Sequence, residues 1–255
     1  MDKTTLIRNF SRCAHSYDAY ADVQKRSAAQ LLAFTPESSR CMKILEIGCG
    51  TGNLTLLLRE RFKYAEIKAI DISEKMVEVA AKKLNGKGVK FIIADAETII
   101  LDEGFDLIAS NACFQWFDDL ENALLKYCGL LNEGGTLLFS MFGPSTFGEL
   151  NAALTNTFRR ASTSSVNFYA KEKITGILKR GLKAVKVGET EYRESFPSLR
   201  ELLNRVKYTG IRGAGFNAGL SFTSRSLQRL EEEYLGKFNE IRATYQVFFC
   251  RGLSR

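Results

Sequence analysis

The chain has 255 residues, of which 45% are hydrophobic and 25% charged, with 20 Gly and 3 Pro. This composition is typical of a folded globular protein and argues against disorder, and the length suits one α/β domain with a sizeable core. The first fifteen residues lack the apolar core of a signal peptide, and no later stretch is apolar for the roughly 18 residues that a membrane span needs. The sequence therefore predicts a cytoplasmic protein that does not act in a membrane.

Cysteine and histidine are poorly placed for a metal site or a disulfide framework. The six cysteines are scattered, no pair has CxxC spacing, and a chain of this size does not need disulfides to hold its core. His15 is the only histidine, so a Cys/His zinc site would have few possible ligands, and a Ser-His-Asp triad would have to use His15 as its base. We expect reduced thiols, no metal and a structural role for His15.

The formal charge of +7 is unevenly distributed. Residues 1–150 hold 17 Lys and Arg against 20 Asp and Glu, whereas residues 151–255 hold 19 against 9. The second part thus has a net charge of +10, which indicates either an anionic partner or a solvated basic surface.

Strand and helix patterns alternate from residue 43 onward, after an expected helix at 18–34. Short apolar runs predict buried parallel strands at 43–47, 65–71, 89–95, 105–111 and 135–142. Helices are predicted between them at 53–62, 74–84 and 120–131. The alternation implies right-handed βαβ units and therefore an α/β fold with a doubly wound, mostly parallel sheet.

The pattern becomes less regular after residue 142. Helices are predicted at 148–159, 198–210 and 224–238, with Gly210 ending the second of them, and a loop is predicted at 162–165. Alternating residues predict strands at 184–195 and 243–252.

The residues that carry chemistry begin where the first predicted strand ends. The sequence Glu46-Ile47-Gly48-Cys49-Gly50-Thr51-Gly52 lies between an apolar strand and a helix that begins near Asn53. Glycine lets the backbone turn sharply and approach a ligand, and the first N–H groups of the following helix are unpaired. A nucleotide-like cofactor is therefore expected over this turn.

Two acidic residues make this pattern more specific, since dinucleotide-binding proteins carry a similar GxGxxG turn. Asp71 ends the second strand, where a carboxylate can accept hydrogen bonds from both hydroxyls of a ribose. Asp95 ends the third strand, and an ionised carboxylate there suits the exocyclic amine of adenine. The three loops share one edge of the sheet, so together they predict one site.

The combination of ExGxGxG, Asp71 and Asp95-Ala96 resembles class I S-adenosylmethionine (SAM)-dependent methyltransferases over roughly residues 40–142. The resemblance implies a seven-stranded sheet with an antiparallel last strand, SAM as cofactor and S-adenosylhomocysteine as product. By the same resemblance, the methionine side of the cofactor is bound by Gly48, Cys49, Gly50 and Asn111, and Glu46 belongs to the same cofactor-binding set. Asp71 binds the ribose. The adenine lies between Ile72 and Met76, and its edge is bound by Asp95 and the Ala96 backbone.

A narrower resemblance comes from the flanking segments. Three segments are similar to those of the malonyl-acyl-carrier-protein O-methyltransferases of biotin synthesis. They are Phe10-x-Arg12-x-Ala14-x-x-Tyr17-Asp18-x-x-Ala21-x-x-Gln24, Ser110-Asn111-x-x-x-Gln115-Trp116 and the ending ATYQVFFCRG. Cys13 stands where that family more often has Ala. The resemblance implies methylation of the free carboxylate of a malonyl thioester on an acidic acyl-carrier protein, whose docking the basic second part would assist.

Such a reaction requires no general base, because a carboxylate with a pKa of about 4 is ionised at pH 7. Gln115 and Trp116 carry N–H donors that suit a carboxylate, and Tyr17 is expected to close the site from the N-terminal segment. These three are the predicted catalytic residues.

We expect a single methyltransferase domain over residues 1–255. Residues 1–39 would form a helical cap over the cofactor site, and residues 143–182 a helical insertion that acts as a substrate lid. The basic residues that border this insertion are Arg159, Arg160, Lys171, Lys173, Lys179 and Arg180.

Two alternatives stay open, a methyltransferase of a small carboxylic acid and a SAM-binding regulatory protein without turnover. An RNA methyltransferase is disfavoured, because the sequence has no recognised RNA-binding signature and has Ser110-Asn111-Ala112-Cys113 in place of an NPPY-type tetrad. We expect no nucleic-acid partner and a monomer.

Overall fold

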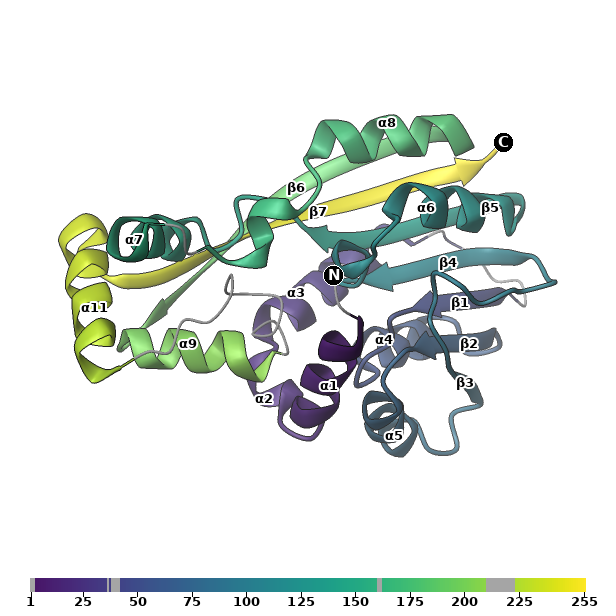
Figure 1. The fold of residues 1–255 in the computed structure, drawn as a ribbon. Coiled ribbons are helices and arrows are strands. Elements are labelled where there is room, and N and C mark those ends of the chain that lie inside the picture. The colour runs from purple at the N-terminus through teal and green to yellow at the C-terminus, as the bar shows by residue number, and fades with distance from the viewer. Residues whose placement is uncertain (1–2, 36, 38–41, 160–161, 210–222) are drawn as a thin grey trace.

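The computed structural model describes residues 3–35, 37, 42–159, 162–209 and 223–255. Its centre is a seven-stranded sheet with the strand order β3-β2-β1-β4-β5-β7-β6 (Figure 1). Strand β7 runs antiparallel to both of its neighbours, and the other neighbouring pairs are parallel. The predicted doubly wound, mostly parallel sheet with an antiparallel last strand is confirmed.

The strands are β1 (Lys43–Ile47), β2 (Glu66–Asp71), β3 (Val89–Ile93), β4 (Phe105–Asn111), β5 (Leu131–Phe142), β6 (Leu182–Phe196) and β7 (Ile241–Ser254). The α-helices are α1 (Lys3–Cys13), α2 (Tyr17–Tyr20), α3 (Asp22–Leu32), α4 (Asn53–Arg61), α5 (Glu74–Lys83), α6 (Leu120–Gly129), α7 (Gly148–Phe158), α8 (Lys171–Gly181), α9 (Leu199–Tyr208) and α11 (Ser224–Phe238), and the short 3-10 helices are η1 (Phe114–Trp116) and η2 (Ser164–Asn167). None of the helices in the described parts of the chain is both long and apolar enough to cross a membrane.

The N-terminal segment differs from its prediction. The single helix expected at 18–34 is wrong: α2 and α3 are separated at Ala21, whose φ of −96° and ψ of 41° leave the helical region. Helix α1 lies in the helical cap expected at 1–39, in which no separate bounds were predicted for it; its apolar Leu6 and Phe10 are four residues apart and so share one face. Gly210, expected to end α9, lies outside the described residues.

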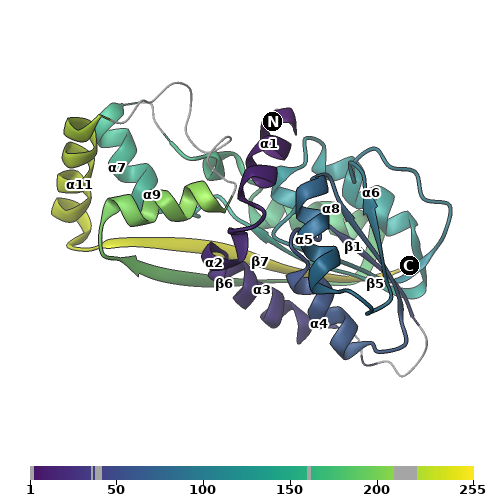
Figure 2. The ribbon, with the colours of Figure 1, turned by 90° about the horizontal axis from the view of Figure 1, so that it is seen from below.

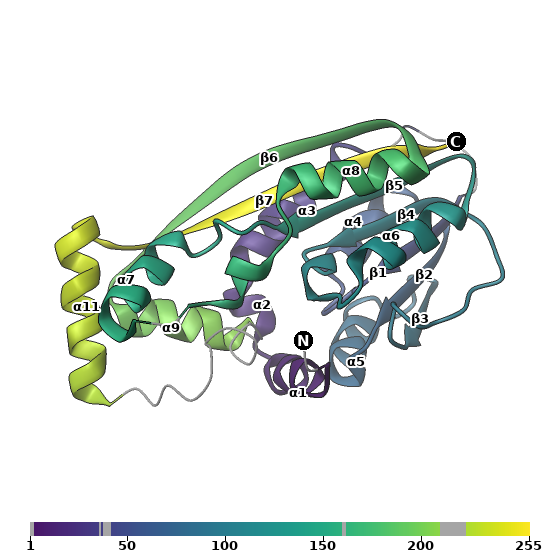
Figure 3. The same cartoon turned by 45° about the horizontal axis from the view of Figure 1, so that its top comes forward.

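Two helical layers cover the sheet because successive side chains of a strand point to opposite faces. In β1, Ile44 packs in the same core cluster as Leu31 of α3 and Leu58 of α4. Its neighbour Leu45 packs on the other face, in the cluster that includes α6 and α8. Figures 1 and 3 show α6 and α8 together on this second face.

The long strands β6 and β7 carry a second group of helices. Both strands extend past the rest of the sheet, and α7, α9 and α11 gather at that end (Figures 1 and 2). Helix α7 packs against α11 and β7, whereas α8 packs against α6 and β6. The predicted insertion at 143–182 therefore contains one helix of this distal group and one helix of the sheet layer, and its role as a lid stays a prediction.

A buried carboxylate attaches the distal group to the sheet. Glu149 of α7 is only 8% exposed and accepts hydrogen bonds from the Thr244 hydroxyl at 2.6 Å and the Thr244 backbone N–H at 3.1 Å. Arg242 Nε lies 3.3 Å from the same carboxylate. Because Thr244 and Arg242 belong to β7, this carboxylate fixes α7 on that strand.

Replacing Glu149 by Ala should lower the free energy of unfolding by about 1–3 kcal/mol, because two donors of Thr244 would be left without an acceptor. Urea denaturation measures the change. The control is Glu172→Ala on the exposed side of α8, which should alter stability by no more than about 0.5 kcal/mol. Equal effects of the two substitutions would contradict the role of Glu149.

Candidate functional site

The turn after β1 lies close to two neighbouring segments and depends on glycine. The backbone N–H groups of Gly48 and Cys49 both donate to the Ile70 carbonyl of β2, at 2.8 and 2.9 Å. Gly48 has a φ of +69°, and a Cβ added to it would lie 2.2 Å from Cys113 Sγ. A side chain at position 48 is therefore excluded both by backbone conformation and by space.

A cavity lies beside this turn. The predicted cofactor residues that line it are Gly48, Gly50, Asp71, Ile72, Met76, Asp95, Ala96 and Asn111. A second, smaller cavity shares Tyr17, Gly48, Gly50 and Asn111 with the first and is also lined by Glu46 and Cys49. The fold thus brings all ten predicted cofactor residues to one of two cavities with common walls.

Asp71 is held at the end of β2 by backbone donors. Its carboxylate accepts from the N–H of Gly50 and from the N–H of Ser73, each at 2.8 Å. Burial raises the pKa of Asp71, and these two hydrogen bonds oppose that rise. The carboxylate is therefore oriented before any ligand binds, and it keeps further acceptor capacity for hydroxyl groups.

Asp95 has a partner that the sequence did not suggest. Lys3 Nζ of α1 lies 2.6 Å from Asp95 Oδ2 and 2.5 Å from Glu97 Oε2. The other oxygen of Asp95 accepts from the Glu97 backbone N–H at 2.9 Å. An adenine amine at Asp95 would consequently share this carboxylate with Lys3.

Glu46 is the buried acid of the second cavity. It is 1% exposed, and its Oε2 has no hydrogen-bond partner. Burial raises the pKa of Glu46 to about 8, so the side chain is largely neutral at pH 7. A buried carboxyl oxygen left unpaired beside a cavity points to a ligand with a polar group that pairs with it.

Asn111 at the end of β4 is fixed from three sides. Its Oδ1 accepts from the hydroxyls of Ser27 and Ser140 at 2.7 and 2.6 Å, and its Nδ2 donates to the Gln24 carbonyl at 3.0 Å. Since Ser27 and Gln24 belong to α3, the side chain joins the N-terminal segment to the edge of the sheet.

The three predicted catalytic residues are placed differently. Tyr17 lines both cavities, and Trp116 lines the larger one, where its ring packs edge-on against Phe10 with centroids 6.1 Å apart. Gln115 lines neither: its amide nitrogen donates to the Ala112 carbonyl at 2.6 Å, and its Oε1 is buried without a partner. The turn of η1 directs this side chain back onto its own backbone, so contact of Gln115 with substrate stays a prediction.

Sequence reasoning missed several residues of the larger cavity: Lys3, Leu6, Phe10, Glu97, Cys113 and Phe117. Glu97 accepts from the backbone N–H groups of Asp118 and Asp119, at 3.1 and 2.8 Å, as well as contacting Lys3. The helical spacing of Lys3, Leu6 and Phe10 was a signal for the first three. The contacts of Glu97 had no signal, because they join segments about twenty residues apart.

A model described as a methyltransferase domain matches residues 45–139, which include the turn after β1, Asp71 and Asp95. Malonyl-[acyl-carrier protein] O-methyltransferases of Bacillus cereus and Acetivibrio thermocellus are 36% and 37% identical to this chain. Both alignments cover 98% of this chain, with 96% and 93% of the respective relative. This chain belongs to the malonyl-[acyl-carrier protein] O-methyltransferase family.

Solved structures agree on the fold of this methyltransferase. The YcgJ protein of Bacillus subtilis has a TM-score of 0.64 at 17% identity, over 90% of this chain and 98% of its own. Phosphoethanolamine N-methyltransferase 2 of Haemonchus contortus, solved with SAM, has a TM-score of 0.60 at 17% identity, over 95% of this chain and 57% of its own. At such identities the likeness concerns the fold.

The enzyme is a SAM-dependent methyltransferase, and its cavities suit that cofactor. The unpaired Glu46 oxygen can accept from an ammonium group, and the oriented Asp71 carboxylate can accept from ribose hydroxyls. Met76 and Ile72 supply apolar surface for a purine.

Binding of S-adenosylhomocysteine should strengthen as the pH rises from 6 to 8. Below about pH 8 the free protein holds a proton on Glu46, and pairing with the ligand ammonium requires its release. The logarithm of the association constant should therefore rise by up to about one per pH unit and level off above pH 8. Calorimetry across this range measures the slope.

The control for this prediction is Glu46→Gln, which should bind more weakly at pH 8 and show no such slope. A flat profile for the unaltered enzyme between pH 6 and 8 would contradict the pairing of Glu46 with the ammonium group.

Proposed function

We propose that this enzyme transfers the methyl group of SAM to the free carboxylate of malonyl-acyl-carrier protein, forming the methyl ester at an early step of biotin synthesis. The observation that carries the proposal is the extent of the family match. The methyltransferase model covers residues 45–139, whereas the relatives named for this activity match 98% of the chain. The match thus includes α1 to α3 and the distal helices, which surround the cofactor domain.

The proposed placement of the cofactor follows the two cavities. Ile72 and Met76 would hold the adenine in the larger cavity, Asp95 and Ala96 would bind its edge, and Asp71 would bind the ribose; all five residues line that cavity. The smaller cavity would hold the methionine part, and the unpaired oxygen of Glu46 there would accept from its ammonium group. The shared wall at Tyr17 and Asn111 then lies near the sulfonium.

The residues around this wall fit transfer to a carboxylate. The nucleophile is already ionised at pH 7, so the protein has to orient it and exclude water. Phe10, Trp116 and Phe117 supply an apolar wall, and burial raises the pKa of Tyr17, which keeps its hydroxyl protonated as a donor. SAM supplies the electrophilic methyl group, and in-line orientation can supply roughly 7–11 kcal/mol in favourable cases.

An assay with radiolabelled SAM tests the proposal against its two alternatives. We expect methyl transfer to malonyl-acyl-carrier protein, sensitive to base hydrolysis as a methyl ester should be, and much less transfer to free malonate. Equal rates on free malonate would favour a small-carboxylate methyltransferase. Tight SAM binding with no transfer to either would favour a regulatory protein.

The partner in this proposal is an acidic carrier protein that docks over α1. The inward face of α1 lines the larger cavity through Leu6 and Phe10, and its outward face exposes Arg8 and Arg12. The helix contains no acidic residue. A carrier bound here would deliver its thioester arm beside the cavity, and the positive surface would speed docking.

Two of the basic residues that border residues 143–182 are already paired with acids. Lys171 lies 3.6 Å from Glu189, and Arg180 forms an ion pair with Glu121. Both residues belong to α8, on the layer that covers the sheet. Arg159 is exposed at the end of α7, and Arg160 lies outside the described residues. The proposal also includes three properties predicted from the sequence: a cytoplasmic location, a monomeric state and no nucleic-acid partner.

Reversing both arginines, in the variant Arg8→Glu with Arg12→Glu, should raise KM for malonyl-acyl-carrier protein about tenfold at low salt and flatten its salt dependence. KM for a small malonyl thioester should not change. The matched control is Lys179→Glu with Lys183→Glu, which makes the same change in net charge at exposed positions on α8 and β6. Equal effects of both double variants would show that net charge, and not the surface of α1, recruits the carrier.

A further inference from the structure

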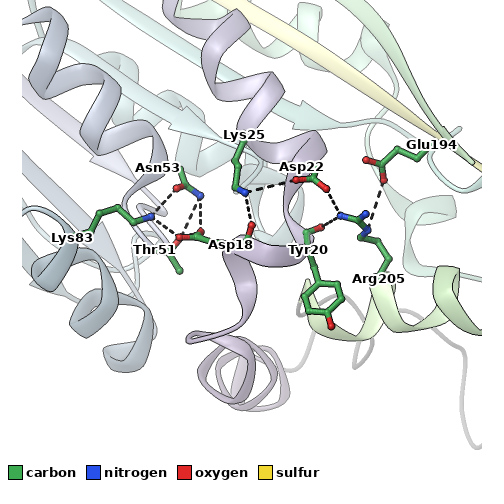
Figure 4. Close-up of polar contacts among 9 residues, drawn as sticks. All are labelled: Asp18, Tyr20, Asp22, Lys25, Thr51, Asn53, Lys83, Glu194 and Arg205. Atoms are coloured by element: carbon green, nitrogen blue, oxygen red, sulfur yellow. Dashed lines mark hydrogen bonds and ion pairs between the residues drawn. The ribbon is translucent and has the colours of Figure 1, made fainter. Parts of the chain in front are cut away.

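Asp18 accepts hydrogen bonds from three side chains that belong to the cofactor-binding part of the chain. Its Oδ1 accepts from Thr51 Oγ1 at 2.6 Å and from Asn53 Nδ2 at 2.9 Å, and its Oδ2 lies 2.7 Å from Lys83 Nζ (Figure 4). Lys83 also donates to Asn53 Oδ1 at 2.8 Å. Four side chains from α2, the turn after β1, α4 and α5 therefore form a closed polar cluster, which we call the Asp18 cluster.

The Asp18 cluster lies at the start of the helix that follows the glycine turn. Thr51 and Asn53 both line the smaller cavity, and Asn53 is the first residue of α4. Lys83 lines neither cavity and reaches the cluster from the end of α5. Burial of Asp18 favours a raised pKa, but the hydrogen bonds from Lys83, Thr51 and Asn53 outweigh it and lower the pKa. The carboxylate is consequently charged at neutral pH.

The residue before Asp18 faces the reaction space. Tyr17 lines both cavities and packs against Phe10, with ring centroids 6.4 Å apart. Phe10 in turn packs against Trp116, which packs edge-on against Phe168 at 5.5 Å. Because Tyr17 and Asp18 are adjacent in a helix of four residues, the anchoring of Asp18 also fixes the position of Tyr17 and the start of this aromatic row.

The other end of the same segment offers a natural comparison. Asp22 Oδ2 lies 2.7 Å from Arg205 Nη1, which also donates to the Tyr20 carbonyl at 2.8 Å (Figure 4). Arg205 Nε lies 3.9 Å from Glu194. These contacts join the segment to α9 and β6, and neither Asp22 nor Arg205 lines either of the two cavities beside the glycine turn. Asp18 and Asp22 thus each pair with a cation at 2.7 Å, the first at the cofactor turn and the second at α9.

We propose that Asp18 is a positioning residue for the cofactor, because it binds the N-terminal segment to the turn after β1 and thereby holds Tyr17 against the bound methionine part. The proposal rests on the proposed placement of the cofactor, in which Tyr17 and Thr51 border its methionine end. It concerns cofactor binding alone, so it holds for any methyl acceptor.

The test measures the affinity for S-adenosylhomocysteine by calorimetry, without any methyl acceptor. Asp18→Asn removes the negative charge of the carboxylate that accepts from Lys83 and Asn53. It should raise Kd at least about tenfold, the change expected when charged hydrogen bonds are lost. Asp22→Asn makes the same chemical change at the pair with Arg205 and should leave Kd within about twofold. Equal increases of Kd in both variants would overturn the proposal. Loss of either aspartate pair would then weaken binding by destabilising the whole N-terminal segment.

A double-mutant cycle separates positioning of Tyr17 from a local effect on α4. If Asp18 acts through Tyr17, Tyr17→Ala should raise Kd much less in the Asp18→Asn background than in the unaltered enzyme. Additive effects would overturn the role of Asp18 in holding Tyr17. A thermal unfolding scan of each variant confirms that the compared proteins are folded.

Lys83→Met provides a second route should Asp18→Asn fail to fold. It opens the same cluster from a residue outside both cavities and should raise Kd about threefold or more, because Asp18 and Asn53 lose their common donor. An unchanged Kd in a folded Lys83→Met variant would contradict the proposal. If the unaltered enzyme binds S-adenosylhomocysteine but does not methylate malonyl-acyl-carrier protein, that result would refute only the proposed substrate.

Discussion

The close approach of the turn after β1 to β2 and to Cys113 is the constraint on which the site depends. The turn is held to β2 by two hydrogen bonds to Ile70, and a Cβ at Gly48 would collide with Cys113. At Gly52, φ is +83°, and a Cβ would lie 2.8 Å from a Leu84 methyl carbon. Glycine at these positions lets α4 begin beside α5, which brings Asn53 within reach of Lys83. Both cavities and the Asp18 cluster follow from that geometry.

The N-terminal segment completes the site from far away in the sequence. Lys3 pairs with Asp95 across 92 residues, and Asp18 pairs with Lys83 across 65. Both pairs are partly buried, so each acid gains a fixed direction. The segment therefore provides walls for the cavities and also orients charged side chains, Asp95 and Lys83, that belong to the cofactor-binding part of the chain.

The proposed reaction requires no proton transfer to or from the protein, and the residues of the cavities fit this requirement. Burial raises the pKa of Tyr17, Cys49 and Cys113, so none of them is an anion near neutral pH. Glu46, with a pKa of about 8, would change its charge when an ammonium group arrives. An apolar wall with few charged groups favours orientation and exclusion of water, which is what methyl transfer to an ionised carboxylate requires.

The sequence by itself determined the sheet and the acidic residues that meet at its edge. Short apolar runs separated by helices define parallel strands whose carboxyl ends share one edge, so Glu46, Asp71 and Asp95 had to converge there. The antiparallel last strand and the SAM dependence came from the resemblance that these residues support. Local patterns carried this information because strand period, glycine turns and strand ends are properties of neighbouring residues.

Only the tertiary structure decided what closes the site. The break at Ala21, the contact of Lys3 with Asp95 and the Asp18 cluster all depend on where α1 to α3 pack against the sheet. The inward turn of Gln115 and the assembly of α7 with α11 likewise follow from long-range packing. Such contacts join residues that are distant in the chain, and side-chain hydrogen bonds between them leave no periodic signal in one sequence. The physical reason is that strand and helix are decided by near neighbours, whereas partners across a cavity are decided by the packing of whole elements.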